Sequence, residues 1–187
     1  MDDMIKRVIK KVKKGDQQAF GELIELYQHK VYQICFRMIG NRQEAEDLAQ
    51  EAFLRAYLNI DSYDINKKFS SWLFRIATNL TIDRLRKKKP DYYLDAEIAG
   101  AEGMTLYTQL AADTELPEDQ VVDLELQETI QKEMMQLPPK YRSAVVLKYM
   151  EDLSLKEISE IMHIPVATVK TRIHRGREAL RKRLRHL

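Results

Sequence analysis

The sequence predicts an all-α protein in which two small helical domains are joined by an acidic, flexible linker. Apolar residues recur at helical spacing in both halves of the chain, and the C-terminus carries a short helix, a break and a basic helix in succession. Residues 91 to 128 contain eleven acidic residues and no lysine or arginine. Such charge asymmetry indicates basic domains on either side of an acidic connector. We therefore place the domains at 1–90 and 126–187 and the linker at 91–125.

Composition narrows the class of protein. The 187 residues are 44% hydrophobic, enough for two small cores. No run of eighteen apolar residues occurs, and "MDDMIKRVIKKVKKG" lacks the apolar segment of a signal peptide, so we expect a cytoplasmic protein without direct membrane insertion. Cys35 is the only cysteine and lies on an apolar helix face, which predicts an inert core thiol. The histidines show no ligand spacing, so we expect no metal and no cofactor.

The first domain begins with two predicted helices. Asp16 is expected to cap the first, which ends at Gly40-Asn41. Its apolar positions follow a 3.6-residue period: Phe20, Leu23, Ile24, Tyr27, Val31, Ile34, Cys35 and Met38. The second, "RQEAEDLAQEAFLRAYLNI", presents a polar face formed by Glu44, Asp47, Gln50, Glu51 and Arg55. Such a face is either simply solvated or a docking surface.

A third helix is predicted after the polar loop "DSYDINKK", with Ser70 as its N-cap. One face carries Trp72, Arg75, Asn79 and Arg86, and Tyr63 lies in the loop before it. Aromatic rings and arginines beside a basic stretch are typical of surfaces that hold unstacked bases, and an asparagine amide can read a base edge. Trp72 fits a core position equally well, whereas Tyr63 in a polar loop is harder to explain as core.

The C-terminal pattern predicts a helix-turn-helix motif. In "LSLKEISEIMHIP", Ser154 and Glu157 have the spacing of a capping box, and Pro165 breaks the helix. The basic helix that follows has an apolar stripe of Val169, Ile173, Gly176, Leu180 and Leu184. The opposite side offers candidates for base edges at Thr168, Thr171, His174 and Arg175, and for phosphates at Lys170, Arg172 and Arg177. The alternative is a surface helix whose charges keep the protein soluble.

The linker is long enough to connect two domains that contact separate DNA elements. About 35 flexible residues span roughly 30 to 35 Å on average and at most about 115 Å, whereas elements about sixteen base pairs apart lie roughly 55 Å from each other. Because the linker is acidic, we expect it to lie along a basic channel of another protein rather than along DNA phosphates. The alternative is that the linker is a purely solvated spacer.

Four motifs occur in the order and spacing of a known family: "DLAQEAFLRAY", "FSSWLFRIATNLTIDRLRK", "LPPKYRSAVVLKYMEDLSLKEISEIM" and "IPVATVKTRIHRGREAL". Together they resemble bacterial sigma factors of the extracytoplasmic-function group, nearest to the sigma-W type. The resemblance implies a sigma region 2 domain at 1–90 and a sigma region 4 domain at 126–187.

The resemblance also implies roles for particular residues. Binding to core RNA polymerase falls to Asp47, Gln50, Glu51 and Arg55. Opening of the minus-10 element and capture of one of its bases fall to Tyr63 and Asn79, with Trp72, Arg75 and Arg86 nearby. The residues implied to recognise the minus-35 element are Lys170, Thr171, Arg172, His174 and Arg175. The helix periodicity, and not the resemblance, adds Thr168 as a further candidate. His174 occupies a position that varies in kind across the family.

The partners implied are core RNA polymerase, through its beta-prime clamp and beta flap, promoter DNA, and a membrane-anchored anti-sigma factor. The linker would thread the RNA-exit region of the polymerase. The protein would be cytoplasmic, held at the inner membrane face by the anti-sigma factor until envelope stress releases it. We expect no bond chemistry and no small-molecule substrate. The competing classes are a helix-turn-helix regulator that acts without polymerase and a nuclease, which only acids such as Asp83 favour.

Overall fold

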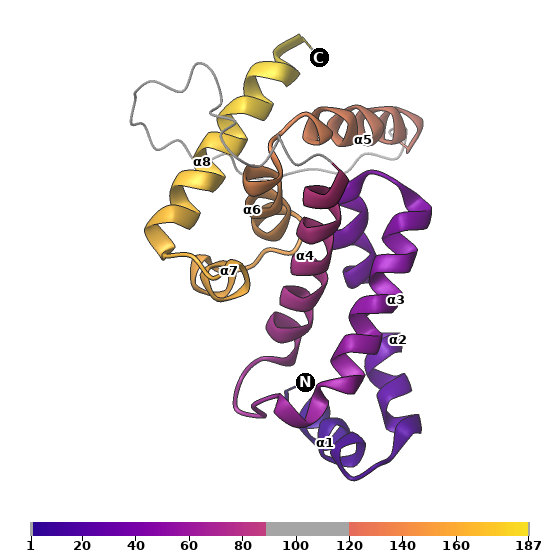
Figure 1. The fold of residues 1–187 in the computed structure, drawn as a ribbon. Coiled ribbons are helices and arrows are strands. Elements are labelled where there is room, and N and C mark those ends of the chain that lie inside the picture. The colour runs from indigo at the N-terminus through magenta and orange to yellow at the C-terminus, as the bar shows by residue number, and fades with distance from the viewer. Residues whose placement is uncertain (1, 89–119, 187) are drawn as a thin grey trace.

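The computed structural model describes residues 2–88 and 120–186, and all of their regular elements are helices (Figure 1). The all-α prediction is therefore confirmed. The N-terminal part contains α1 (Asp2–Lys13), α2 (Gln17–Ile39), α3 (Arg42–Leu58), the 3₁₀ turn η1 (Ile60–Ser62) and α4 (Phe69–Lys88). The C-terminal part contains α5 (Gln120–Met135), α6 (Pro139–Tyr149), α7 (Leu155–Met162), α8 (Val166–Arg183) and the 3₁₀ turn η3 (Leu184–His186).

The helix ends follow the capping residues expected from the sequence. Asp16 accepts a hydrogen bond from the Ala19 amide at 3.1 Å and so begins α2. Gly40 ends α2 in the left-handed conformation, with φ of 73°, which an L side chain rarely adopts. One residue later the Asn41 side chain accepts from the amide of Glu44 at 3.0 Å and begins α3. The sharp reversal between α2 and α3 therefore follows from two adjacent residues.

The core of the N-terminal domain lies between α2, α3 and α4, which run along the length of the molecule (Figure 1). Cys35 is fully buried there, and burial raises the pKa of its thiol to about 11, while a hydrogen bond with Thr81 opposes the shift. A thiol with that pKa stays protonated at neutral pH, as expected of an inert core residue. α1 packs across the end of α2 and contributes Ile5, Val8, Ile9 and Val12 to the same core.

The C-terminal domain is organised around α6, whose residues from Tyr141 to Leu147 are buried. α8 packs along α6, and α7 contacts both helices. A Cβ added at Gly176 of α8 would lie 2.6 Å from Val145 Cγ2 and 3.3 Å from the Tyr141 carbonyl oxygen. The two helices approach this closely because residue 176 has no side chain.

The two domains are packed against each other, an arrangement that we call closed. α7 lies against α4, and α5 and α6 contact α2 (Figure 1). Arg142 of α6 is only 3% exposed; its Nη1 donates to the Met38 carbonyl oxygen at 2.5 Å and its Nη2 donates to that of Leu137 at 3.1 Å. One guanidinium thus joins the last turn of α2 to the turn that precedes α6.

The expectation of a flexible linker does not hold at its C-terminal side. α5 begins at Gln120, so residues 120–125, which we assigned to the linker, are helical. The sequence pattern missed this turn because acidic residues continue from the linker into the helix. The remainder of the predicted linker, 91–119, lies outside the described residues. The N-cap prediction for the third helix is also wrong, because α4 begins at Phe69 and Ser70 lies inside it.

One face of α4 carries two buried hydroxyl groups. Phe74 contacts Tyr27 of α2, and Thr81 forms a hydrogen bond with Cys35 of α2, so this side of α4 faces α2. Between that side and the exposed Arg75, helical geometry places Ser71 and Thr78, two turns apart. Their hydroxyl oxygens are buried and have no hydrogen-bond partner within the part of the chain that the structure describes.

An ion pair joins the loop before α4 to the first turn of α7. Lys68 Nζ lies 2.6 Å from Glu157 Oε1. Partial burial raises the pKa of the Glu157 carboxyl, but hydrogen bonds from Lys68 and Ser154 outweigh this and lower it to about 2. The charged carboxylate is therefore the form that favours the closed arrangement.

We predict that acid breaks this ion pair. The folded pKa of Glu157 is depressed, so its contribution is complete above about pH 4.5, the ordinary glutamate value, and disappears as the pH falls toward 2. Lys68→Met should therefore lower the free energy of unfolding at pH 7, and its difference from the wild type should shrink between about pH 4.5 and 2. Urea denaturation across that range measures the difference. A deficit that stays constant with pH would show that Lys68 does not act through the Glu157 charge.

Candidate nucleic-acid and polymerase interfaces

The helix-turn-helix motif is formed by α7, a three-residue turn and α8. The Ser154 hydroxyl accepts from the amide of Glu157 at 3.2 Å, and the Glu157 carboxylate accepts from the amide of Ser154 at 3.0 Å, so the predicted capping box is confirmed. α7 ends at His163, whose left-handed φ is 53°. The Ser159 hydroxyl donates to the Ile164 carbonyl oxygen at 2.6 Å and stabilises the turn. α8 then starts at Val166, directly after Pro165.

α8 presents its predicted polar side outward. Val169, Ile173 and Gly176 are buried as expected, Ala179 joins them, and Leu180 and Leu184 are only half-buried. Four of the residues predicted to meet the minus-35 element are exposed: Lys170, Thr171, His174 and Arg175.

Two of the predicted minus-35 residues are less accessible. Thr168 and Arg172 are half-buried, and desolvation by burial lowers the pKa of Arg172 although the nearby Tyr141 opposes this. The Arg175 Nη1 donates to the Tyr141 hydroxyl at 3.5 Å, and the Thr171 hydroxyl donates to the carbonyl of Ala167 at 3.1 Å. Arg175 keeps further N–H donors, and the Thr171 hydroxyl can still accept a hydrogen bond, so both can interact with DNA beside these contacts.

A groove of about 350 Å³ lies between the end of α3, η1 and α4. The structure brings three predicted minus-10 residues together along it, Trp72, Arg75 and Asn79. Arg55, predicted for polymerase binding, also lines it, as do Asn59, Ser62 and Asp83. A half-buried indole beside an exposed guanidinium and an exposed amide can stack on a base, neutralise a phosphate and pair with a base edge.

Sequence reasoning missed Asn59 and Ser62 as groove residues. The Asn59 side-chain amide donates to the Arg55 carbonyl oxygen at 2.8 Å, and the Ser62 hydroxyl donates to the Asn59 carbonyl oxygen at 2.7 Å. These bonds shape the turn that follows α3. The two side chains line the groove because of the shape of this turn, and no residue spacing in the sequence predicts that shape. Arg86 lies farther along α4, outside the residues that line the groove, and pairs with Asp83 at 3.6 Å.

Tyr63, whose polar loop made it hard to explain as a core residue, is nevertheless buried. The residue is 4% exposed, and its ring lies 5.5 Å from that of Phe69 and 5.0 Å from that of Trp72, between centroids. Its hydroxyl donates to the Lys67 carbonyl oxygen. The loop is polar in sequence, but two aromatic side chains at the start of α4, Phe69 and Trp72, pack over Tyr63. A base-contacting role for Tyr63 stays a prediction that requires the loop to rearrange.

The predicted polymerase surface lies on α3. Asp47, Gln50 and Arg55 are exposed, Glu51 is half-buried, and Arg55 Nε lies 2.7 Å from Glu51 Oε1. Leu54 and Leu58 lie about one turn apart on one face of α3 and are 53% and 69% exposed. Exposed leucines flanked by charged side chains are typical of a docking surface. Sequence reasoning did not single out this pair.

Within the described residues, no helix is long and apolar enough to cross a membrane. Across the same residues, no three side chains of histidine, cysteine, aspartate or glutamate gather where they could hold a metal ion.

The fold and its surfaces define a two-domain promoter-recognition protein, and sequence comparison agrees. Residues 23–90 match the family described as Sigma-70 region 2, and residues 127–180 match Sigma-70, region 4. The chain is 68% identical to the ECF RNA polymerase sigma factor SigW of Bacillus subtilis over 187 residues, all of both chains. It is 36% identical to the RNA polymerase sigma-H factor of Pseudomonas aeruginosa, over 97% of this chain and 94% of that protein. The chain belongs to the extracytoplasmic-function group of the sigma-70 family.

Solved structures share the fold. CnrH, solved in complex with the cytosolic domain of CnrY, superposes with a TM-score of 0.70 over 97% of each chain, at 22% identity. The sigma factor RpoE of Bartonella quintana, solved with the anti-sigma factor NepR, gives a TM-score of 0.65 over 89% of this chain and 96% of that one, also at 22% identity.

We predict that Gly176→Ala displaces α8. The new Cβ would lie within contact distance of Val145 and of the Tyr141 backbone, so the helices must separate. Overpacking of this kind costs about 1–3 kcal/mol of folding free energy. Gly21→Ala is the matched control: nothing lies within 4 Å of its Cβ, so alanine should stabilise α2 by about 0.5–1 kcal/mol. Thermal denaturation of the two variants checks both signs.

We also predict that Tyr63 supports the fold. Tyr63→Ala should cost about 3–5 kcal/mol, as removal of a buried ring does, whereas Tyr63→Phe removes only the hydrogen bond to Lys67, about 0.5–1.5 kcal/mol. Urea denaturation distinguishes the two. A Tyr63→Ala protein with wild-type stability but defective promoter opening would instead assign the ring to a base.

Proposed function

We propose that this protein directs core RNA polymerase to promoters by reading a minus-35 element with α8 and a minus-10 element with the groove beside α4. The observation that carries the proposal is the groove itself, which gathers Trp72, Arg75 and Asn79 on one accessible surface. A helix-turn-helix protein that acts on duplex DNA alone would have no use for this groove or for the α3 face. Family membership supplies the polymerase as partner.

In the minus-35 element, the N-terminal half of α8 enters the major groove. Thr171, His174 and Arg175 reach base edges, and Lys170 contacts phosphate. Thr168 and Arg172 flank these residues from half-buried positions, where Arg172 packs beside Tyr141. The bound helix positions the polymerase before the strands separate.

In the minus-10 element, one base leaves the stack and enters the groove. Unstacking costs a few kcal/mol, which stacking on an aromatic ring, about 1–3 kcal/mol per base, partly offsets. Trp72 provides the ring, Asn79 the paired donor and acceptor, and Arg75 the charge opposite phosphate. Arg86 extends the basic path along α4, and Tyr63 supports Trp72 from beneath. The chain supplies binding energy and no bond chemistry.

Polymerase binds the face of α3 through Asp47, Gln50, Glu51 and Arg55, by way of the beta-prime clamp, and contacts the C-terminal domain through the beta flap. We further propose a membrane-anchored anti-sigma factor as negative regulator, which holds the protein at the cytoplasmic side of the membrane until envelope stress. The support is indirect: CnrH was solved with the cytosolic domain of CnrY, and RpoE with the anti-sigma factor NepR.

Run-off transcription with purified core polymerase tests the proposal, on templates that vary the minus-35 and minus-10 elements separately. We expect initiation that depends on the protein and follows both elements. Arg175→Ala should reduce minus-35 discrimination by about 1–3 kcal/mol, whereas Arg177→Ala, at a phosphate position, should weaken all templates alike. Asn79→Ala should impair open-complex formation more than core binding. A folded protein that does not bind active core polymerase would overturn the proposal.

A further inference from the structure

One face of α1 is strongly basic and has no part in the proposed function. Arg7, Lys10 and Lys11 of α1 are exposed, as is Lys14 in the turn directly after the helix. Helical geometry places Arg7, Lys10 and Lys11 within about 100° of one another around the helix axis. We call these four residues the basic face of α1. The opposite face, formed by Ile5, Val8, Ile9 and Val12, is buried in the core of the N-terminal domain. The position of the basic face is therefore fixed by packing.

Among the described residues, none of the four forms an ion pair, although cations elsewhere do: Arg55 with Glu51, Lys68 with Glu157, and Lys88 with Glu44. A compact group of uncompensated positive charges attracts an anionic ligand whose charges repeat at a similar spacing. Successive phosphates along one strand of a nucleic acid, about 3.4 Å apart along a duplex axis, have that property.

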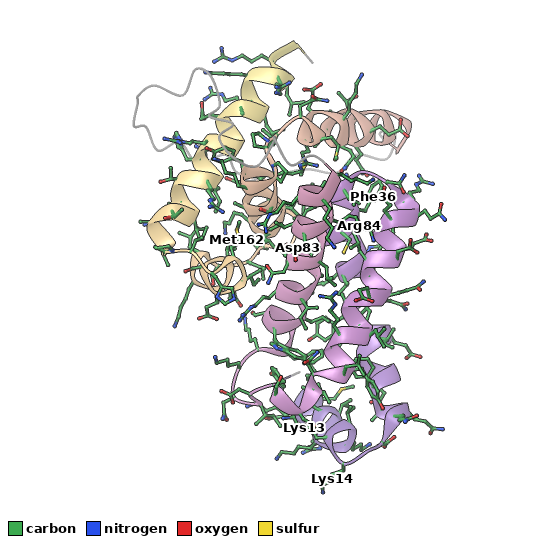
Figure 2. The ribbon with its side chains drawn as sticks, in the orientation of Figure 1. Lys13, Lys14, Phe36, Asp83, Arg84 and Met162 are labelled. Carbon is green, nitrogen blue, oxygen red and sulfur yellow. The ribbon has the colours of Figure 1, made fainter. Side chains whose placement is uncertain are left out.

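α1 is tethered to the loop that borders the minus-10 groove. Lys13 Nζ donates to the Asp61 carbonyl oxygen at 3.1 Å and to that of Tyr63 at 2.8 Å. Ser62, between these two residues, lines the groove. Lys13 and Lys14 lie together at the end of the molecule where α1 meets this loop (Figure 2). α1 is thus hydrogen-bonded to the loop whose Ser62 lines the groove.

We propose that the basic face of α1 holds the sugar-phosphate backbone of the promoter strand next to the base captured in the groove. The inference rests on the proposed function. Its ligand is a run of DNA phosphates, bound without regard to sequence, and Lys10, Lys11 and Lys14 bind the phosphates nearest to the groove. Lys13 takes no part in DNA binding; it positions the helix.

Two other occupants fit less well. A basic amphipathic helix that binds a lipid surface inserts its apolar face, but the apolar face of α1 is buried in the protein. An acidic surface of the polymerase would satisfy the charges but would not account for the tether to the groove loop. The experiment separates this second occupant from DNA.

The test measures promoter binding by polymerase holoenzyme as a function of salt, on a fork-junction DNA with an unpaired minus-10 strand. Lys10→Gln with Lys14→Gln should reduce the magnitude of the slope of log affinity against log salt by about 1.4, since each phosphate neutralised on a single strand contributes about 0.7. Lys10→Arg with Lys14→Arg keeps the charges and should keep the wild-type slope. Lys30→Gln with Lys132→Gln removes two exposed charges from α2 and α5 and should also leave it unchanged.

Neutral methylphosphonate linkages in the same strand locate the bound phosphates. At the phosphates that Lys10 and Lys14 hold, they should weaken binding by the wild type and have no further effect on the Lys10→Gln, Lys14→Gln protein. An unchanged slope in that protein, or an equal fall in the Lys30→Gln, Lys132→Gln control, overturns the inference. A defect confined to core binding without DNA assigns the face to polymerase and also overturns it. If wild-type protein fails to recruit polymerase, the proposed function falls as well, which separates the two failures.

Discussion

The buried Arg142 guanidinium is the interaction on which the closed arrangement depends. It donates to the Met38 carbonyl at the end of α2 and to the Leu137 carbonyl before α6, so both domains share one donor group. Removing it would leave buried carbonyl oxygens of both domains without that donor, at a cost of about 1–3 kcal/mol for each group that finds no substitute. The packing of α7 on α4 and the ion pair of Lys68 with Glu157 join the same two domains at a second place.

α4 links the two halves of the proposed mechanism. One face lines the minus-10 groove with Trp72, Arg75 and Asn79, and the adjacent face contacts α7, the first helix of the helix-turn-helix motif. The loop leading into α4 contacts α1 through Lys13 and α7 through Lys68. A change in the position of the C-terminal domain therefore alters the surroundings of the helix that lines the groove, and a strand bound in the groove alters the same helix.

Local signals in the sequence predicted most of the helices and caps. Asp16, the reversal at Gly40, and the Ser154–Glu157 capping box depend only on neighbouring residues, so one sequence suffices to find them. Interactions between residues distant in sequence were not predictable in the same way. Tyr63 looked exposed because Phe69 and Trp72, which cover it, follow a polar loop. Arg142 lies in the first turn of α6, where a charged residue is ordinarily exposed. The packing of α6 against α2 buries it, and this packing cannot be inferred from neighbouring residues.

The hydroxyls of Ser71 and Thr78 have an energetic consequence for the closed arrangement. Each is buried on α4 without a hydrogen-bond partner among the described residues, and such a group costs about 1–3 kcal/mol relative to a hydrated one. Any opening of the domains that exposes this face of α4 would return both to water. Hydration of the two hydroxyls would then offset part of the free energy needed to expose the apolar surface between the domains. Since about 1.4 kcal/mol changes an equilibrium tenfold, each such hydroxyl lowers, by roughly that factor, the differential affinity that a partner needs to shift the population from closed to open.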